Sequence, residues 1–197
     1  MKRLVSLALL LIIALSSLCF FSCQQDDIFL YVLNKDKSGY IISAVVKYPL
    51  VVLDGNIIPE EFNGLPVTEI AAGGFAGWES LYSIVIPGSV EKIGNYAFGM
   101  TGIFDATIGE GTKYIDNLAF ANSNVEVMYL PSTIEYIGEG AFANCSFFNN
   151  IVYNGTIEQW NAIPKGEGWC ENMGGANIVA INCLDGVITF YSRDISQ

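Results

Sequence analysis

The chain has 197 residues, enough for a single domain once a leader is removed. Its 20 acidic and 9 basic side chains argue against nucleic acid as a partner, because a negative surface repels the phosphate backbone. The sequence contains no histidine, which excludes Ser-His-Asp and Cys-His catalysis as well as histidine metal sites.

Residues 1–23 have the pattern of a secretory leader. Two basic residues begin it, a largely apolar stretch covers residues 4–15, and small residues with cysteine follow. The apolar run is too short for a convincing membrane span. The leader ends in Phe20-Phe21-Ser22-Cys23, which resembles a lipoprotein signal because a small residue precedes the cysteine that receives the lipid. We therefore expect lipidation of Cys23, with a plain cleaved signal peptide as the alternative.

A short polar tether, residues 24–27, follows this cysteine. Removing Lys2 and Arg3 with the leader leaves 7 basic residues against 20 acidic ones, a net charge of −13. Such a surface disfavours adsorption to anionic lipid head groups, so membrane attachment would depend on the lipid alone. These features predict an extracytoplasmic, lipid-anchored protein of the cell envelope, or else a secreted one.

The next segment, residues 28–60, is predicted to form an N-terminal cap and a lead-in. Two β-branched and aromatic runs, Ile28–Leu33 and Tyr40–Val46, flank the turn-rich residues 34–39, which is the pattern of a β-hairpin. The turn also matches the first half of a calcium loop. Val45 stands where that loop requires a glutamate, so we interpret the segment as a turn.

A period of 22 to 23 residues dominates residues 61–147. The pair Ala97-Phe98 returns as Ala119-Phe120 and Ala141-Phe142, and each phenylalanine lies five residues after an isoleucine. A fixed period of this length indicates a solenoid, in which each coil buries its apolar face against its neighbours. The apolar slots of the three aligned units are Leu81, Ile84, Ile86, Val90 and Ile93; Ile103, Ala106, Ile108, Thr112 and Ile115; Val125, Met128, Leu130, Ile134 and Ile137.

Each repeat is predicted to contribute one short parallel strand. The stretch L-x-x-I-x-I alternates apolar and other residues at its end and stops at Pro87, Gly109 or Pro131, which bounds the strand. Helix is expected only as single turns near the Ala-Phe pairs and as a short piece around residues 157–163.

Degenerate units flank the regular repeats. In the preceding unit, Ile70 lies 23 residues before Ile93 and leads to Gly74-Phe75. The last degenerate repeat and the C-terminal cap are assigned to residues 148–197. There Phe148, Ile151, Tyr153, Ile157 and Trp160 are predicted to take the slots of Val125, Met128, Leu130, Ile134 and Ile137.

The repeat pattern L-x-x-I-x-I-P-x-x-V-x-x-I-G-x-x-A-F-x, which residues 81–99 fit almost letter for letter, resembles the leucine-rich repeats of the BspA-like class of bacterial surface proteins, also described in treponemes. Gly109, Asp116 and Gly74 depart from that pattern. The resemblance implies a mostly-β leucine-rich repeat solenoid, a right-handed coil of short parallel strands with short helical turns, an N-terminal hairpin cap and an irregular C-terminal cap. It also implies attachment to host or neighbouring-cell proteins, as for its relatives.

The candidate binding residues lie between the apolar slots, because alternate side chains of a strand face away from the core and stack into columns. They are Tyr82, Ser83, Val85, Phe104, Asp105, Thr107, Glu126, Val127 and Tyr129. Several are apolar or aromatic where a solvated surface prefers polar groups, and exposed apolar clusters can mark partner sites. The alternative is that they only cover the edges of a narrow sheet.

We find no sequence pattern that predicts chemistry, and we expect neither a cofactor nor a metal. Cys145 is predicted to be a small core residue, whereas Cys170 and Cys183 could form a disulfide in an oxidising compartment. The carboxylates that a hydrolase could use, Glu60, Glu61, Glu110, Glu135 and Glu139, are interpreted as solvated charges.

The sequence therefore predicts a monomeric, non-enzymatic module that binds extracellular or envelope proteins. The alternatives are a structural or assembly component of the envelope and, third, a carboxylate-dependent hydrolase.

Overall fold

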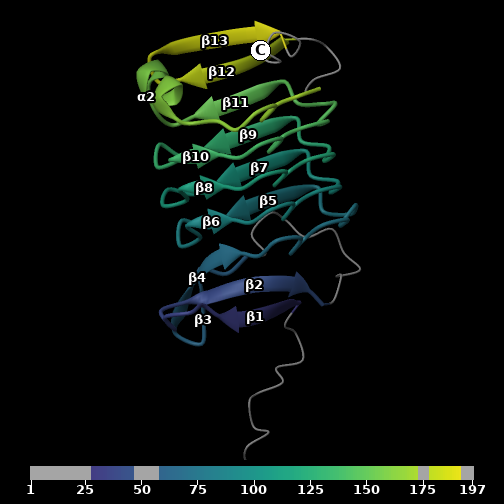
Figure 1. The fold of residues 1–197 in the computed structure, drawn as a ribbon, viewed down its shortest axis with the longest axis vertical. Coiled ribbons are helices and arrows are strands. Elements are labelled where there is room, and N and C mark those ends of the chain that lie inside the picture. The colour runs from purple at the N-terminus through teal and green to yellow at the C-terminus, as the bar shows by residue number, and fades with distance from the viewer. Residues whose placement is uncertain (1–27, 47–57, 173–177, 192–197) are drawn as a thin grey trace, which may run out of the picture.

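The structure is a computed structural model and describes residues 28–46, 58–172 and 178–191. The predicted leader, the tether, Cys23 and part of the lead-in lie outside the described residues. The described chain winds into a mostly-β solenoid in which parallel strands of successive coils lie side by side (Figure 1).

One of its two sheets, here called the strand-face sheet, contains the strands predicted from the repeats. It is made of β5 (Ser83–Ile86), β7 (Asp105–Ile108), β9 (Val127–Leu130), β11 (Asn150–Tyr153), β12 (Ile178–Cys183) and β13 (Gly186–Tyr191). Pairing is parallel from β5 to β12. Ile84, Ala106, Met128 and Ile151 are consecutive partners, which confirms the predicted alignment of the slots.

The other sheet, here called the second sheet, was predicted only in its N-terminal hairpin. Its strands are β1 (Phe29–Leu33), β2 (Tyr40–Val45), β4 (Leu65–Ile70), β6 (Lys92–Ile93), β8 (Tyr114–Ile115) and β10 (Tyr136–Ile137), and β3 (Glu61–Phe62) pairs with β4. The expectation of one strand per repeat is wrong, because each coil pairs again at its fifth apolar slot. Ile70, Ile93 and Ile115 are partners there, so the incomplete unit is aligned as predicted.

The N-terminal hairpin is confirmed. β1 and β2 pair antiparallel, and β2 pairs parallel with β4, so the hairpin covers the first coil. The carboxylate of Asp36 accepts hydrogen bonds from the backbone amide and the hydroxyl of Ser38, at 3.0 and 2.6 Å, as expected of a turn. The ring of Tyr31 on β1 stacks on the ring of Phe62 in β3, with centroids 3.8 Å apart.

The C-terminal cap is more regular than predicted. Helix α2 (Ile157–Ala162) begins at Thr156, whose hydroxyl accepts from the amide of Gln159 in a capping box. β12 and β13 then form an antiparallel hairpin with Cys183 opposite Gly186. This hairpin adds two strands to the strand-face sheet, which satisfies the backbone groups of β11 and covers the last coil.

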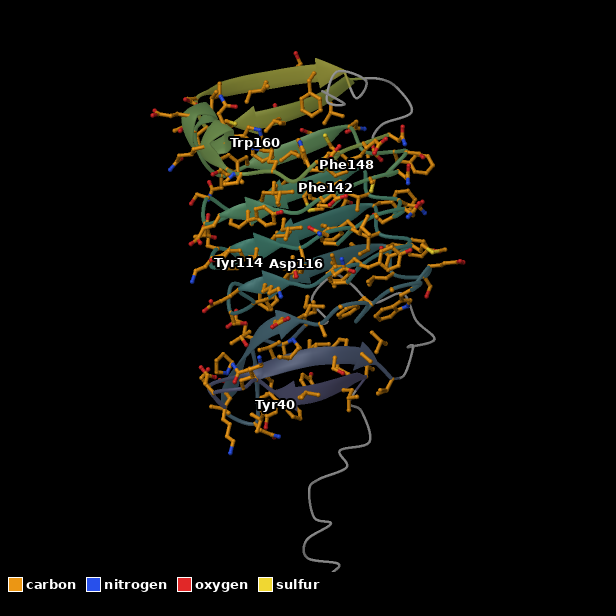
Figure 2. The ribbon with its side chains drawn as sticks, viewed as in Figure 1. Tyr40, Tyr114, Asp116, Phe142, Phe148 and Trp160 are labelled. Carbon is orange, nitrogen blue, oxygen red and sulfur yellow. The ribbon has the colours of Figure 1, made fainter. Side chains whose placement is uncertain are left out.

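The core lies between the two sheets and is built from the repeating residues. Phe75, Phe98, Phe120 and Phe142 are at most 1% exposed, and their successive ring centroids are 4.8, 5.0 and 5.7 Å apart. Phe148 packs against Phe142 at 5.4 Å and closes this stack toward the cap (Figure 2). The Ala-Phe pairs lie in hydrogen-bonded turns and not in helices, as in the bond from the Ala97 amide to the Gly94 carbonyl at 3.1 Å.

The predicted place of Trp160 in the isoleucine column is wrong. Lys165 bridges in parallel to Ile137, and the Gly166 amide donates to the Ile137 carbonyl at 2.8 Å, as Gly138 does to Ile115 at 2.7 Å. The turns of α2 are an insertion that displaces the column by several residues. Trp160 is still buried, because it packs on Tyr153 at 5.3 Å between ring centroids.

Candidate functional site

The candidate residues within the strands align in columns on the outward side of the strand-face sheet. Ser83, Asp105 and Val127 are register partners, and so are Val85, Thr107 and Tyr129. The burial pattern of β7 alternates between exposed and buried residues, so these side chains point away from the core. Asn150 and Ala180 continue the first column, and Val152 and Asn182 the second, which the sequence did not predict.

An aromatic patch lies where the strands of this sheet begin. It consists of Tyr82, Phe104 and Phe147, which are 46%, 38% and 57% exposed. The rings of Tyr82 and Phe104 are stacked with centroids 6.2 Å apart, and Phe147 lies 6.4 Å from Phe104. The sequence prediction missed Phe147, because only its neighbour Phe148 fits a repeated slot.

Glu126 occupies the next place after Phe104 in the edge column. The Phe104 amide donates to the Tyr82 carbonyl and the Glu126 amide to the Phe104 carbonyl, both at 2.8 Å. The Glu126 carboxylate accepts from Nδ2 of Asn149 at 3.2 Å. One carboxylate is therefore held at the border of the aromatic patch.

A shallow hollow of about 510 Å³ lies where the strands end. Its lining includes Glu110, Tyr129, Val152, Asn154, Asn182 and Leu184. The Glu110 carboxylate accepts from Nδ2 of Asn154 at 2.6 Å and from the amide and hydroxyl of Ser132 at 3.3 Å. These three donors fix the carboxylate, so the hollow presents a positioned acceptor beside the exposed ring of Tyr129.

The two sheets differ in how their charges are balanced. On the second sheet, Lys92 forms ion pairs with Asp116 at 3.1 Å and Glu69 at 3.6 Å, and Lys113 pairs with Glu91 at 3.3 Å. The hydrogen bond to Asp116 raises the pKa of Lys92. Asp116 and Tyr114 mark this part of the molecule in Figure 2. The strands of the strand-face sheet contain no lysine or arginine.

The three cysteines of the described chain are free thiols, so the disulfide between Cys170 and Cys183 is not formed. Cys145 is fully buried, as predicted, and its thiol donates to the Phe120 carbonyl at 3.1 Å. Burial raises the pKa of Cys145 to about 11 and also raises the pKa of Cys170 and of Cys183. These thiols are poor nucleophiles in the folded protein.

The carboxylates considered for hydrolysis are spread over different coils and sheets. Glu60 directly precedes β3, in which Glu61 lies, whereas Glu110 follows β7 in the strand-face sheet. Glu135 precedes β10 and accepts from the Tyr114 hydroxyl at 2.8 Å, and Glu139 follows β10. Within the described ranges, no cluster of three or more acidic or cysteine side chains could hold a metal ion.

Comparison with protein families identifies the repeats. The model for the BspA type leucine rich repeat region matches residues 67–163 in six copies. Through these residues the chain is a BspA-type leucine-rich repeat protein. Such repeats form stacked modules whose extended surfaces bind partners. The sequence has no significant match among curated proteins.

Solved structures of bacterial proteins are similar to this chain. The pneumococcal vaccine antigen PcpA aligns with a TM-score of 0.56 and 20% sequence identity. The alignment covers 80% of this chain and 49% of PcpA, so this BspA-type chain spans about half of PcpA. The T. pallidum leucine-rich repeat protein TpLRR aligns at 22% identity over 77% and 86%, with a TM-score of 0.47. A leucine-rich cell surface protein of Faecalibacterium prausnitzii aligns at 28% over 71% and 41%, with a TM-score of 0.40. The likeness to PcpA supports a shared fold.

Proposed function

We propose that this BspA-type protein is a non-enzymatic binding module, an adhesin that attaches to host or neighbouring-cell proteins through the strand-face sheet. The observation that carries the proposal is the patch of Tyr82, Phe104 and Phe147, three exposed rings at the start of a regular sheet, with Phe104 paired to each of the other two. The phenylalanine stack already fills the core, so these outer rings are not needed to complete it.

The properties of the patch are those of a protein contact surface. Tyrosine and phenylalanine bring large contact area and lose little side-chain entropy on binding. The sheet beneath them is held by backbone hydrogen bonds along every coil, so the rings are largely pre-organised. The hollow beside Tyr129 is shallow, which suits a protein surface better than an enclosed small molecule.

The proposed location is the outside of the cell, with the chain attached through a lipid on Cys23 or secreted. The leader pattern of residues 1–23 supports it. The relative from F. prausnitzii is described as a cell surface protein, and PcpA as a vaccine antigen. Among the described residues, no helix is long and apolar enough to cross a membrane.

A second candidate function is assembly with another component of the same envelope. The N-terminal hairpin supports it, since Leu30, Val32 and Leu33 on β1 and the adjacent Val46 are between 42% and 59% exposed. An apolar surface on a cap is suited to contact with a neighbouring protein. In that case the strand face would be dispensable for binding.

A binding screen of residues 24–197 against extracellular-matrix and cell-surface proteins tests the proposal. The decisive comparison uses Tyr82→Ser, Phe104→Ser and Tyr129→Ser combined, with Leu30→Ser and Val32→Ser combined as the control. We expect at least a tenfold loss of affinity for the first variant, because buried aromatic anchors dominate interface energies. Partners that are lost only with the control variant would instead support the assembly function.

A further inference from the structure

The strand-face sheet carries acidic groups that no cation of the described protein balances. Asp105 lies at the start of β7, beside the edge strand β5, whereas Glu126 lies at the aromatic border and Glu110 at the hollow. The segments that form this face, residues 82–88, 104–110 and 126–132, contain no lysine or arginine. The same holds for residues 147–154 and 178–191.

Asp105 is the most available of these acids. It is exposed, and its carboxylate makes no hydrogen bond or ion pair with any residue of the described ranges. Its register partners are Ser83 and Val127, neither of which carries a charge. By contrast, the Glu110 carboxylate is held by Asn154 and Ser132, so it is part of the local structure.

On the second sheet, in contrast to the strand-face sheet, lysines lie beside the acidic residues. There Lys92 lies between Glu69 and Asp116, and Lys113 pairs with Glu91. The remaining lysines of the described residues are Lys35 and Lys37 in the hairpin turn and Lys165 in the C-terminal cap. The second sheet therefore pairs lysines with acids across its coils, whereas the acids of the strand-face sheet have no such cation beside them in the described residues.

Aromatic rings accompany the unpaired acids. Phe104 directly precedes Asp105 in the chain and lies in the same edge column as Glu126. The face of an aromatic ring attracts a guanidinium or ammonium group through the negative charge of its π electrons. A nearby carboxylate strengthens that attraction, and the combination disfavours acidic partners.

We infer that the partner's contacting segment is a cationic peptide segment, rich in arginine or lysine, whose side chains lie over Tyr82 and Phe104 and pair with Asp105 and Glu126. The inference rests on the proposed function and specifies the partner's chemistry. The net charge of −13 for residues 24–197 speeds the approach of such a segment, and the local acids fix where it binds.

The test measures binding of labelled deca-arginine, deca-lysine and deca-glutamate peptides to residues 24–197. The face variant combines Asp105→Asn and Glu126→Gln. The control variant combines Glu60→Gln and Glu139→Gln, which removes the same net charge from other exposed sites. We expect only the two cationic peptides to bind. The face variant should weaken their affinity roughly tenfold, because two favourable charge contacts together contribute about that factor. The control variant should weaken it by less than twofold.

Equal weakening by both variants would show general charge attraction and overturn the inference, as would equal binding of deca-glutamate or no cationic binding at all. The proposed function fails separately. A partner from the screen could lose binding with the serine variants and keep it with Asp105→Asn and Glu126→Gln. That result would support the binding face but refute its preference for cations.

Discussion

The amide of Phe142 donates a hydrogen bond to the carbonyl of Trp169 at 2.8 Å, the same contact that the Phe120 amide makes with the Ala141 carbonyl. Trp169-Cys170 is therefore the next copy of the Ala-Phe pair, 28 residues after Ala141 because α2 is inserted between them. The Asn144 amide likewise donates to the Glu171 carbonyl at 2.8 Å. The cap continues the repeat with changed side chains.

Removing one ring from the phenylalanine stack should destabilise the whole array. Phe120 is fully buried between Phe98 and Phe142, so Phe120→Ala removes a large side chain and leaves a cavity on both sides. We expect the free energy of unfolding to fall by about 3–5 kcal/mol, measured by urea unfolding. Phe147→Ala, at a 57% exposed position, is the control and should cost less than about 1 kcal/mol. Similar losses for both variants would contradict the assignment of core and face.

Lys165 should make stability depend on pH. Its ammonium donates to the carbonyls of Trp160 and Ile163, at 2.7 and 2.9 Å, but burial lowers its pKa from 10.5 to about 8. Between these values the unfolded chain binds the proton and the folded chain does not, so stability rises with pH. The free energy of unfolding of the wild type should therefore increase between pH 8 and 10 relative to Lys165→Met. If the free energy of unfolding of the wild type, measured in urea, stays constant or falls relative to that of Lys165→Met over this pH range, the folded lysine stays charged.

The three thiols should differ in reactivity in the folded, reduced protein. Cys145 and Cys170 are fully buried with raised pKa values, whereas Cys183 is partly exposed at the hollow. With iodoacetamide at pH 8, followed by mass spectrometry of residues 24–197, Cys183 should be alkylated first and the other two only on unfolding. Alkylation of Cys170 as fast as Cys183 would mean that the cap opens readily.

A column of left-handed backbone positions should make a side chain costly at its glycine. Tyr96, Leu118 and Gly140 occupy equivalent places with φ of 55°, 57° and 57°. The left-handed conformation costs a residue with a side chain roughly 1–2 kcal/mol, and only glycine avoids this cost. Gly140→Ala should therefore lower the free energy of unfolding by about 1 kcal/mol, and Leu118→Gly should lower it by less. The reverse order in urea unfolding would show that packing of Leu118 outweighs its backbone cost.

The repeated residues were predictable because each was seen several times. Ile84, Phe98 and Cys145 were assigned to the core from their slots, and all three are buried. The strands β6, β8 and β10 were not predicted, since two residues are too few for an alternating pattern. The β12–β13 hairpin was also missed, although two β-branched runs around Leu184-Asp185 are a hairpin signal.

The candidate site was predicted in part for the same reason. The register fixed by the repeats placed Ser83, Asp105 and Val127 in one column, as the structure has them. Phe147 has no counterpart in the other repeats, so no alignment of slots could assign it to the aromatic patch. The contact between Phe104 and Phe147 is therefore found only in the folded structure.

The most direct test of the account is an NMR titration of isotope-labelled residues 24–197 with a partner from the binding screen. The account predicts that amide shift changes concentrate on the strand-face sheet, at Tyr82, Phe104, Asp105, Tyr129 and Phe147, and spare the second sheet around Tyr114 and Leu118. Shift changes centred on the second sheet or on β1 would contradict the claim that binding belongs to the outward residues of the strand-face sheet.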